Sequence, residues 1–471
     1  MKVQQYYLGC LSHVSYLVTD EKSHTAAVVD PQRDIGQYLA DAARADCTIR
    51  HVFLTHFHAD FLAGHIELRE RVGAAIYLGR KGVTEYPVTH VKDGDRIEFG
   101  DVRLQILETP GHTPEGISIL VFDLAGSADK PYAVMTGDTL FIGDVGRPDL
   151  LASIGVTAEE LADMLYDSLR QKLMTLPDET LVYPAHGAGS LCGKNMSTET
   201  VSTIGEQKKF NYALQPMNRD EFRTIVTAEQ VEAPGYFVHD AMLNRQERPS
   251  LDSALAKSFR PLSLDEVLKQ ASLGAQLLDV RDAIDFEGAH LAGSLNIGIQ
   301  GKYATWSGTI LDRNRPIVVI AEPGREEEAI VRLGRIGFDG VTGYLGGGLD
   351  SLQNRPDLVG RIERATAVAI AELRASPNPP VLVDVRSEKE WAGGHIPGSL
   401  NLPLNHLREA IAGLPSDGKI VVHCEGGYRS AIAASLLARN GRPNVMDLVG
   451  GFKAWAASQL PVEKASGLRN G

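Results

Sequence analysis

Short apolar runs alternate with polar loops along the first half of the chain. Runs of this length, bounded by turn-forming residues, predict strands. Two longer stretches with helical periodicity, 61–71 and 158–173, predict helices. The strands are expected at 26–29, 51–54, 75–78, 102–107, 117–121, 133–135 and 181–183. This alternation predicts an α/β fold with many strands.

A second pattern fills the rest of the chain and occurs twice. The first copy reads LLDVRDAIDFEGAHLAGSLNI from Leu277, and the second reads VLVDVRSEKEWAGGHIPGSLNL from Val381. Asp279 and Asp384 are 105 positions apart. In each copy a later strand runs into a loop and a helix, which predicts a small parallel α/β sheet of its own. We therefore expect a first domain at 1–235, a linker at 236–262, and repeated domains at 263–358 and 363–465.

Charge and cysteine content narrow the function classes. The 471 residues include 47 Lys and Arg against 60 Asp and Glu, a formal charge of −13 that disfavours nucleic-acid and anionic membrane partners. The four cysteines include no C-x-x-C pair, so neither a disulfide framework nor a thiolate zinc site is expected. No apolar run is long enough to span a bilayer. A cytoplasmic homo-oligomer with small-molecule partners is the expectation.

Potential metal ligands gather in the first half, directly after strand-like runs. His56, His58 and Asp60 alternate along an extended segment, so they point the same way. Three further segments offer a ligand after a strand, at His112, Asp138 and His186. Imidazole and carboxylate together suit Zn²⁺ or Fe²⁺ rather than Ca²⁺ or Mg²⁺. The sequence therefore predicts a transition-metal site at one edge of the sheet.

These segments resemble the metallo-β-lactamase superfamily, whose pattern is H-x-H-x-D-H followed by a His, an Asp and a final His. The segment GDTLFIGDVGRPDL after Met135 is similar to the glyoxalase II and persulfide dioxygenase branch. The resemblance implies an αββα sandwich with the metal at its edge. Phe61 stands where the pattern has its third His, and a phenyl ring cannot bind a metal. A dinuclear zinc hydrolase is therefore disfavoured.

Persulfide dioxygenases of this superfamily hold one Fe²⁺ by two His and one Asp. Carried onto this chain, the resemblance implies His56, His112 and Asp138 as ligands, with open positions for water, a persulfide and O₂. His58, Asp60 and His186 then orient ligands, although His58 equally completes a four-ligand set.

The implied substrate is a low-molecular-weight persulfide, commonly glutathione persulfide, which is oxidised to sulfite and the thiol. Arg147 is placed to meet a substrate carboxylate and equally suits a structural salt bridge. Tyr183 and Thr113 flank ligand segments and are further candidates for substrate contact.

The last domain holds a loop suited to carrying sulfur. Cys424 follows the strand KIVVH, and a helix is expected to begin near Ser430. Backbone N–H groups and a helix N-terminus stabilise a thiolate or persulfide anion, and Arg429 supplies positive charge for thiosulfate or sulfite. The loop comprises Cys424, Glu425, Gly426, Gly427, Tyr428, Arg429 and Ser430.

With the earlier DVR and HIPGSLN segments, this loop resembles the rhodanese (sulfurtransferase) family. The resemblance implies that Cys424 carries a persulfide and passes on its outer sulfur. In the first copy Ala321 occupies the cysteine position, so that copy is expected to be inactive.

The whole arrangement is similar to bacterial persulfide dioxygenase–sulfurtransferase fusions of sulfide detoxification. The competing hypothesis is a glyoxalase II-like zinc thioester hydrolase fused to a sulfurtransferase. A sulfur-relay or sensor scaffold with a structural metal is a third. The sequence leaves open the carrier thiol, the direction of the rhodanese step and the role of Cys192, which lies six residues after His186.

Overall fold

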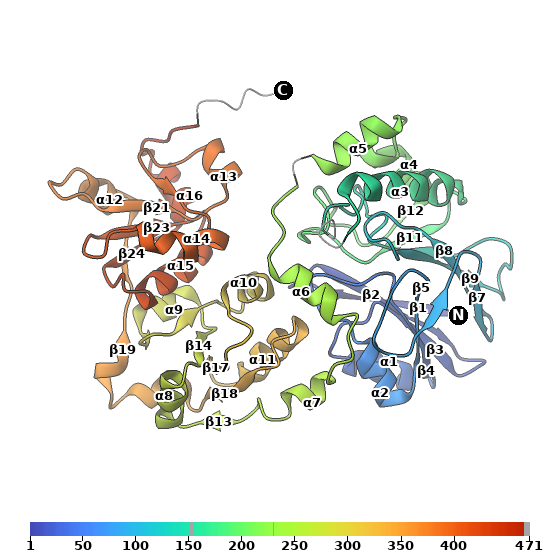
Figure 1. Cartoon of the computed structure of the whole chain (residues 1–471), viewed down its shortest axis with the longest axis horizontal. Helices are drawn as coiled ribbons and strands as arrows, with labels where there is room; N and C mark the ends of the chain where they lie inside the picture. The colour runs from blue at the N-terminus through green and yellow to red at the C-terminus, as the bar shows by residue number, and fades with distance from the viewer. Residues whose placement is uncertain (151–154, 229, 466–471) are drawn as a thin grey trace. The chain divides into compact units, whose positions relative to one another are not determined.

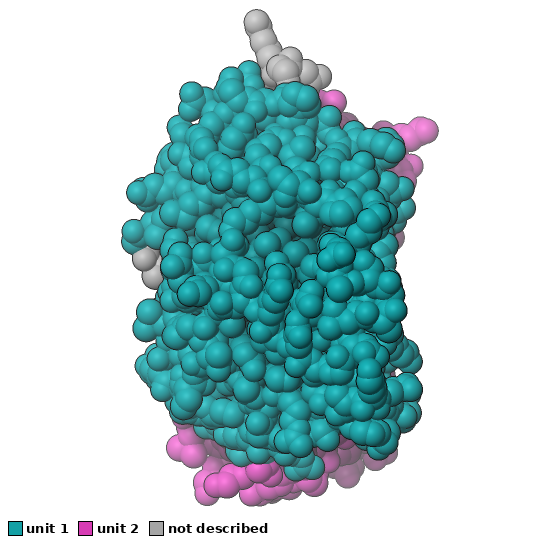
Figure 2. All heavy atoms as spheres, turned by 90° about the vertical axis from the view of Figure 1, so that its right-hand side faces the viewer, with its two compact units in different colours: residues 1–254, 334–337 teal, residues 255–333, 338–471 magenta. Residues whose placement is uncertain are grey.

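The computed structural model describes residues 1–150, 155–228 and 230–465, and divides into two compact units (Figures 1 and 2). The first unit comprises residues 1–254 and 334–337, and the second comprises 255–333 and 338–471. Among the described residues no helix has the length and apolarity needed to span a bilayer.

Two six-stranded sheets form the centre of the first unit. The first has the order β1 (Lys2–Leu8), β2 (His13–Asp20), β3 (Thr25–Val29), β4 (Thr48–Phe53), β5 (Ala75–Gly79) and β6 (Thr89–Val91). The second has the order β12 (Ser202–Thr203), β11 (Leu181–Pro184), β10 (Ala133–Gly137), β9 (Ile117–Asp123), β8 (Val102–Glu108) and β7 (Arg96–Phe99).

The side chains of β2 alternate between the core that lies between the two sheets and a core on the outer face of its own sheet. Val14, Tyr16 and Val18 of β2 pack into a core with Leu104 of β8, whereas Leu17 faces the other way into a second core. That alternation is the two-residue period of a strand. Helices pack on the outer face of each sheet and form two further cores with it (Figure 1). One face carries α1 (Gly36–Arg44) and α2 (His65–Val72). The other carries α3 (Ala158–Gln171), α4 (Ile204–Phe210) and α5 (Arg219–Thr227). The αββα sandwich is confirmed.

The expected strands are present, but β1, β2, β6, β7 and β12 were not expected, and helix α2 begins later than expected. The N-terminal pair β1 and β2 was not expected, because its polar residues interrupt any apolar run. Helix α2 begins at His65 rather than at residue 61, because the backbone before it is hydrogen-bonded elsewhere. Ala63 N donates to Asn244 Oδ1 at 2.9 Å, and Gly64 N donates to Pro31 O at 2.8 Å.

The segment expected to be a linker contains two helices, α6 (Tyr236–Leu243) and α7 (Leu251–Leu255). Asn244, at the end of α6, is fully buried and donates to the carbonyl oxygens of His58 and Phe61, both at 2.8 Å. Arg248 Nη1 lies 2.6 Å from Glu67 Oε1. This segment therefore packs onto the loop that carries the first candidate ligands.

The second unit contains two five-stranded sheets whose strands all pair in parallel. The first sheet has the order β13 (Pro261–Leu262), β18 (Val341–Leu345), β17 (Ile317–Ile320), β14 (Gln276–Asp279) and β16 (Leu295–Asn296). The second has the order β20 (Glu363–Ala365), β24 (Val445–Leu448), β23 (Ile420–His423), β21 (Val381–Asp384) and β22 (Leu400–Asn401). Both sheets share one topology, as the repeat predicts.

Helices cover each of these sheets. The first carries α8 (Leu264–Ser272), α9 (Ala283–Gly288), α10 (Tyr303–Ile310) and α11 (Glu326–Arg335). The second carries α12 (Ala367–Arg374), α13 (Glu388–Gly393), α14 (Leu407–Ala410), α15 (Tyr428–Arg439) and α16 (Gly451–Ala457). The short pair β15 (His290–Leu291) and β19 (Val359–Gly360) adds a separate ribbon. Two small rhodanese-like α/β domains are thus confirmed.

Candidate metal centre and sulfur loop

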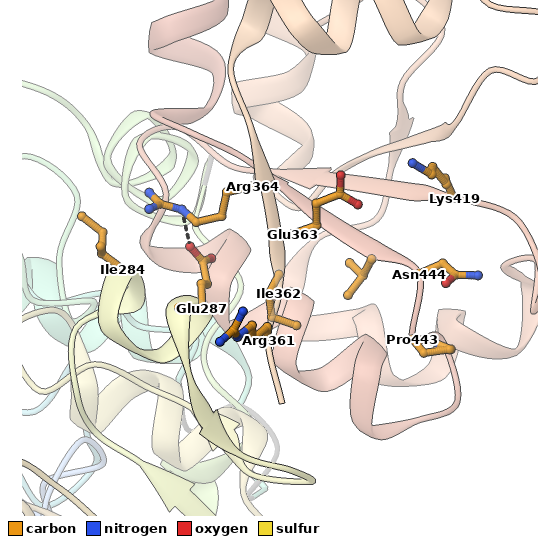
Figure 3. A pocket seen from close by; sticks show the side chains of 11 residues that line it. Ile284, Glu287, Arg361, Ile362, Glu363, Arg364, Lys419, Pro443 and Asn444 are labelled. Carbon is orange, nitrogen blue, oxygen red and sulfur yellow. Dashed lines mark ion pairs between the residues drawn. The ribbon is translucent and has the colours of Figure 1, made fainter. Parts of the chain in front are cut away.

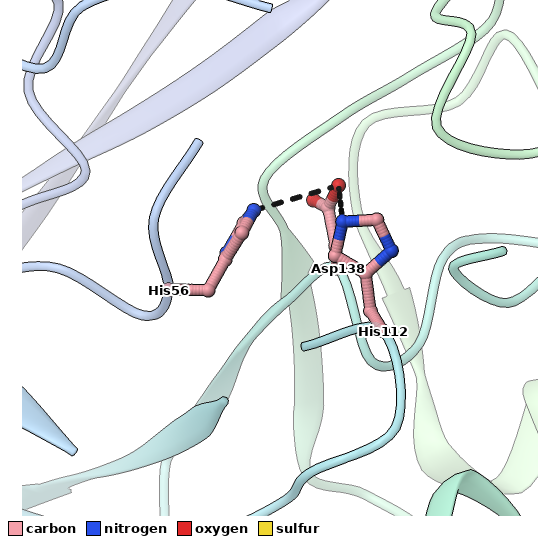
Figure 4. Close-up of side chains that lie close together, drawn as sticks. All are labelled: His56, His112 and Asp138. Carbon is pink, nitrogen blue, oxygen red and sulfur yellow. Dashed lines mark ion pairs between the residues drawn. The ribbon is translucent and has the colours of Figure 1, made fainter. Parts of the chain in front are cut away.

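Three of the expected ligands meet at the ends of strands from both sheets. His56 follows β4, His112 follows β8, and Asp138 follows β10. Asp138 Oδ2 lies 3.7 Å from His56 Nε2 and 3.5 Å from His112 Nε2 (Figure 4). All three side chains are at most 5% exposed. Their donor atoms lie within 4.8 Å of one another, close enough for one metal ion.

Hydrogen bonds fix which nitrogen of each imidazole carries the proton. His112 Nδ1 lies 2.8 Å from Arg147 O, and a carbonyl only accepts, so Nδ1 donates. Thr55 Oγ1 donates to Asp30 Oδ2 at 2.8 Å and therefore accepts from His56 Nδ1 at 2.9 Å. Each Nδ1 is therefore occupied elsewhere, and both Nε2 atoms face the Asp138 carboxylate. Three electron-pair donors turned toward one point fit a bound cation.

Charge within the site is consistent with that arrangement. Burial lowers the pKa of His56 well below its usual range, which keeps this imidazole neutral. Burial acts to raise the pKa of Asp138, but the neighbouring His186 and His56 outweigh it and hold that pKa well below its usual range. The site thus offers a neutral His56 imidazole and an ionised Asp138 carboxylate, the forms that bind metals.

His186 lies between the carboxylates of Asp138 and Asp60 and contacts both. His186 Nδ1 lies 2.8 Å from Asp138 Oδ1, and its Nε2 lies 3.1 Å from Asp60 Oδ2. Burial acts to lower the pKa of His186, but the two carboxylates raise it well above its usual range. His58 turns elsewhere, with Nε2 3.1 Å from Asp30 Oδ1. The structure therefore does not bring His58 into the three-residue group.

Aromatic rings pack around Phe61, which stands at the position of the third His in the pattern. The Phe61 ring packs 4.1 Å from the His13 ring and 4.5 Å from the His58 ring, measured between centroids. Cys192 lies close to Asp60 and His186, with the three donor atoms within 4.8 Å. Burial raises the pKa of the Cys192 thiol well above its usual range.

The three candidate substrate contacts differ in position. Arg147 is buried and forms a bidentate ion pair with Asp149, at 2.7 and 2.6 Å, so its charge is already neutralised. Tyr183 packs in the core between the two sheets. Thr113 lines a small pocket together with His56, His112 and Asp138. Only Thr113 is therefore placed beside the three-residue group.

In the second unit, Cys424 lies at the end of β23 and is 2% exposed. Gly427 N donates to Cys424 Sγ at 3.1 Å, and the φ of Gly427 is 116°, a value that favours glycine. Helix α15 begins at Tyr428, two residues earlier than expected. The loop therefore turns the backbone N–H of Gly427 toward the sulfur, a contact of the kind that anion-binding loops make.

The charged residues of this loop are paired. Arg429 contacts both oxygens of Glu390, at 2.7 and 2.6 Å, and lowers the pKa of Glu390 to about 2 against the opposing effect of its burial. Glu425 accepts from Arg386 Nη1 at 3.0 Å. Ser430 is buried, with its hydroxyl donating to Gly427 O at 3.0 Å. Gly426 is exposed at the tip.

The first rhodanese-like domain has the same strand and glycine turn at the equivalent position, but it has no thiol there. Ala321 follows β17 as Cys424 follows β23. A Cβ on Gly348 would lie 3.0 Å from Ala321 O, and a Cβ on Gly451 would lie 2.4 Å from Cys424 O. Both turns therefore need glycine at equivalent positions, whereas the first copy has no group able to carry sulfur.

Sequence reasoning missed the residues that support the ligands. Asp30 and Thr55 fix the His56 tautomer, and Asn244 ties down the loop after it. Thr55 directly precedes His56, so the sequence alone could have indicated that it lies beside a candidate ligand. Asp30 and Asn244 lie in other segments, and no local pattern links them to the site.

Comparison with known proteins gives three matching regions of the chain. Residues 8–186 match the Metallo-beta-lactamase superfamily, and residues 263–355 and 366–458 each match the Rhodanese-like domain. The Bos taurus protein named persulfide dioxygenase ETHE1, mitochondrial, is 29% identical over 222 residues, covering 47% of this chain and 78% of that protein.

Two further similarities bear on the function. The Arabidopsis thaliana protein named cytoplasmic hydroxyacylglutathione hydrolase is 34% identical over 184 residues, covering 38% of this chain and 66% of that one. A solved metallo-beta-lactamase structure from Staphylococcus aureus subsp. aureus COL has a TM-score of 0.65 at 30% identity, covering 73% of this chain and 98% of that chain.

Proposed function

This chain belongs to the metallo-beta-lactamase superfamily and carries two rhodanese-like domains, and from that premise we propose that it is a persulfide dioxygenase coupled to a sulfurtransferase. Its substrate is a low-molecular-weight thiol persulfide such as glutathione persulfide. The net reaction converts RSSH, O₂ and H₂O into RSH, sulfite and two protons. The S–S bond breaks, the sulfane sulfur is oxidised and O₂ is reduced.

The observation that carries the proposal is the group of His56, His112 and Asp138. The Nδ1 atoms of both histidines are hydrogen-bonded elsewhere, and their Nε2 atoms and a carboxylate oxygen of Asp138 lie within 4.8 Å of one another. We propose that they hold one Fe²⁺, which supplies the redox chemistry between O₂ and the persulfide. Because Zn²⁺ has no redox chemistry, similarity to a protein named persulfide dioxygenase favours iron over zinc.

The protein's own residues position and shield the reactants in this proposal. His186 and Asp60 orient Asp138, and Thr55 orients His56. Thr113 lines the pocket at the ligands. Burial of these groups limits water in the site, which strengthens their electrostatic interactions.

At the second site, we propose that the Cys424 thiolate attacks the outer sulfur of a second molecule of RSSH, which breaks that S–S bond, releases RSH and leaves a persulfide on Cys424. Attack by sulfite on the outer sulfur breaks the Cys424 S–S bond, releasing thiosulfate and leaving the Cys424 thiolate, which Gly427 N stabilises. The reverse step forms the Cys424 persulfide from thiosulfate. Joined to the first reaction, this step places the chain in sulfide detoxification.

Metal analysis and oxygen uptake test the dioxygenase. After anaerobic purification we expect about one iron per chain and rapid O₂ consumption when glutathione persulfide is added. Asp138→Asn should lose both. Cys424→Ser should keep O₂ consumption but lose thiosulfate formation, and Cys10→Ser should retain both activities. Unchanged thiosulfate yield in Cys424→Ser would refute the coupling.

A zinc thioester hydrolase is the second candidate, favoured by similarity to a hydroxyacylglutathione hydrolase. Phe61 argues against it, because water activation between two metals needs a complete second site. Two zinc ions per chain, hydrolysis of an S-acylglutathione and no persulfide-dependent oxygen uptake would replace the dioxygenase with this function.

A further inference from the structure

An open pocket of about 650 Å³ is lined by residues of both rhodanese-like domains, which belong to one compact unit (Figure 3). Helix α9 of the first domain contributes Ile284, Glu287 and Gly288. Residues 361–364 and the segments at the starts of β23 and β24 contribute the rest. Pockets of roughly 300–1,000 Å³ at domain interfaces are common binding sites for small molecules.

The pocket is separate from the Cys424 loop. Lys419 precedes β23 and Val445 begins β24, whereas Cys424 follows β23. Because β23 and β24 are parallel, their starts lie at one edge of the sheet and Cys424 lies at the other. A strand of the length of β23 spans about 13 Å. A molecule held at Lys419 therefore occupies a different site from a sulfur donor at Cys424.

Two cations line this pocket without a carboxylate partner. Arg361 and Lys419 are exposed, and neither forms an ion pair with any described residue. Arg364 differs, because its Nε lies 2.8 Å from Glu287 Oε2. Glu363, the other carboxylate of the lining, has no ion-pair partner within the described part of the chain. The described lining therefore offers two unpaired positive charges and one unpaired negative charge.

The two unpaired cations stand on opposite sides of the pocket. In the sheet β24 lies between β20 and β23, so the backbone segments that precede β20 and β23 are two strand spacings apart, about 10 Å. Figure 3 shows Arg361 and Lys419 well separated. Ile362 and Pro443 add apolar surface to the same lining. One small inorganic anion would leave one cation unpaired, whereas an organic molecule with an anionic group at each end is complementary to both.

We propose that this pocket binds a small amino dicarboxylate of the γ-glutamyl peptide class, with one carboxylate at Arg361, the other at Lys419 and the ammonium group at Glu363. Arginine binds carboxylates in a bidentate manner, and lysine binds them as a point charge. Two carboxylates and one ammonium match the charges of the lining. The choice of glutathione among such peptides rests on the function proposed above, which releases this thiol.

Isothermal titration calorimetry of the full chain with γ-glutamylalanylglycine tests the site. This peptide is glutathione without its sulfur atom, so it neither binds a metal through sulfur nor reacts with Cys424. At pH 8, where Glu287 is mostly ionised, the wild type should bind the peptide. Arg361→Gln and Lys419→Gln should each weaken binding by about two- to fivefold. The double variant should show about the product of the two factors.

A matched pair of peptides tests the role of Glu363. Glu363→Gln should weaken binding of γ-glutamylalanylglycine by about two- to fivefold, because the ammonium group loses its partner. It should tighten binding of the N-acetylated peptide, which has no ammonium group and is repelled by the Glu363 carboxylate. Lys269→Gln, at an exposed lysine of α8 outside the pocket, should behave as wild type. Added salt should weaken binding of both peptides.

These titrations can contradict the proposal in two ways. Absence of binding to the wild type, or equal affinities of the wild type and the Arg361→Gln, Lys419→Gln double variant, would overturn the site. Tighter binding of both peptides by Glu363→Gln would overturn the contact between Glu363 and the ammonium group. Absence of persulfide-dependent oxygen uptake in the wild type would refute the dioxygenase, while the affinity for the sulfur-free peptide would still report this pocket.

Discussion

Thr55 is the residue through which His56 is held in one tautomer. Its hydroxyl accepts from His56 Nδ1 and donates to Asp30, and all three side chains are buried. Outer partners of this kind commonly contribute 10- to 100-fold to metal affinity. The position of His56 Nε2 therefore depends on a residue outside the candidate ligand group of His56, His112 and Asp138.

Replacing Thr55 by Val tests this dependence. The change keeps the side-chain shape but leaves His56 Nδ1 and Asp30 Oδ2 without their shared partner. Affinity for the proposed Fe²⁺ should fall by about 10- to 100-fold, measured by competition with a chelator of known affinity. Thr180→Val is the control, since Thr180 is buried and its hydroxyl has no partner among the described residues. Equal affinities in the two variants would contradict the role of Thr55.

The residues of the site differ in how far sequence could place them. His56, His112 and Asp138 follow apolar runs that form strands, so their convergence at one sheet edge could be foreseen. The pairing of Arg429 with Glu390 could not, because the partners are 39 positions apart and meet only through the packing of α13 beside α15. The turning of His58 toward Asp30 likewise depends on the neighbouring strand.

At the scale of the elements, helix α6 supports the candidate metal site, although its segment was expected to be a linker. Asn244 accepts from Ala63 N and donates to two carbonyl oxygens of the loop between β4 and α2. Buried backbone groups that lose their partner cost about 1–3 kcal/mol. The polar, proline-containing composition of this segment suggested a loop, whereas its tertiary hydrogen bonds decide its structure.

Removing the Asn244 side chain should loosen this loop. In Asn244→Ala we expect the amide of Ala63 to exchange with deuterium about tenfold faster or more, because opening the loop no longer breaks its hydrogen bond. Hydrogen–deuterium exchange of the peptide spanning 56–64 measures the effect. Asn354→Ala, at an exposed asparagine of the second unit, should leave the rate unchanged. Unaltered exchange in Asn244→Ala would show that α6 does not secure the loop.

At the scale of the whole molecule, the two rhodanese-like domains also meet through a buried carboxylate. Glu287 of α9 is 2% exposed, and its Oε2 lies 2.8 Å from Arg364 Nε of β20. The pair borders an open pocket whose other lining residues include Arg361 and Lys419 (Figure 3). Glu287 Oε1 has no hydrogen-bond partner among the described residues, and the nearby Asp447 adds negative charge.

This contact should make stability depend on pH. Burial raises the pKa of Glu287 to about 7, against the opposing effect of Arg364. A carboxyl whose pKa is raised by folding favours the folded state while it is protonated, so its contribution is complete below its unfolded pKa of about 4.3 and is lost as the pH rises through 7. The melting temperature of the wild type, relative to Glu287→Gln, should therefore fall between pH 5.5 and pH 8. Glu363→Gln, at an exposed carboxylate of the same pocket, should keep the wild-type profile. If Glu287→Gln and the wild type change in parallel with pH, Glu287 does not titrate in this range, and Arg364 rather than burial determines its charge.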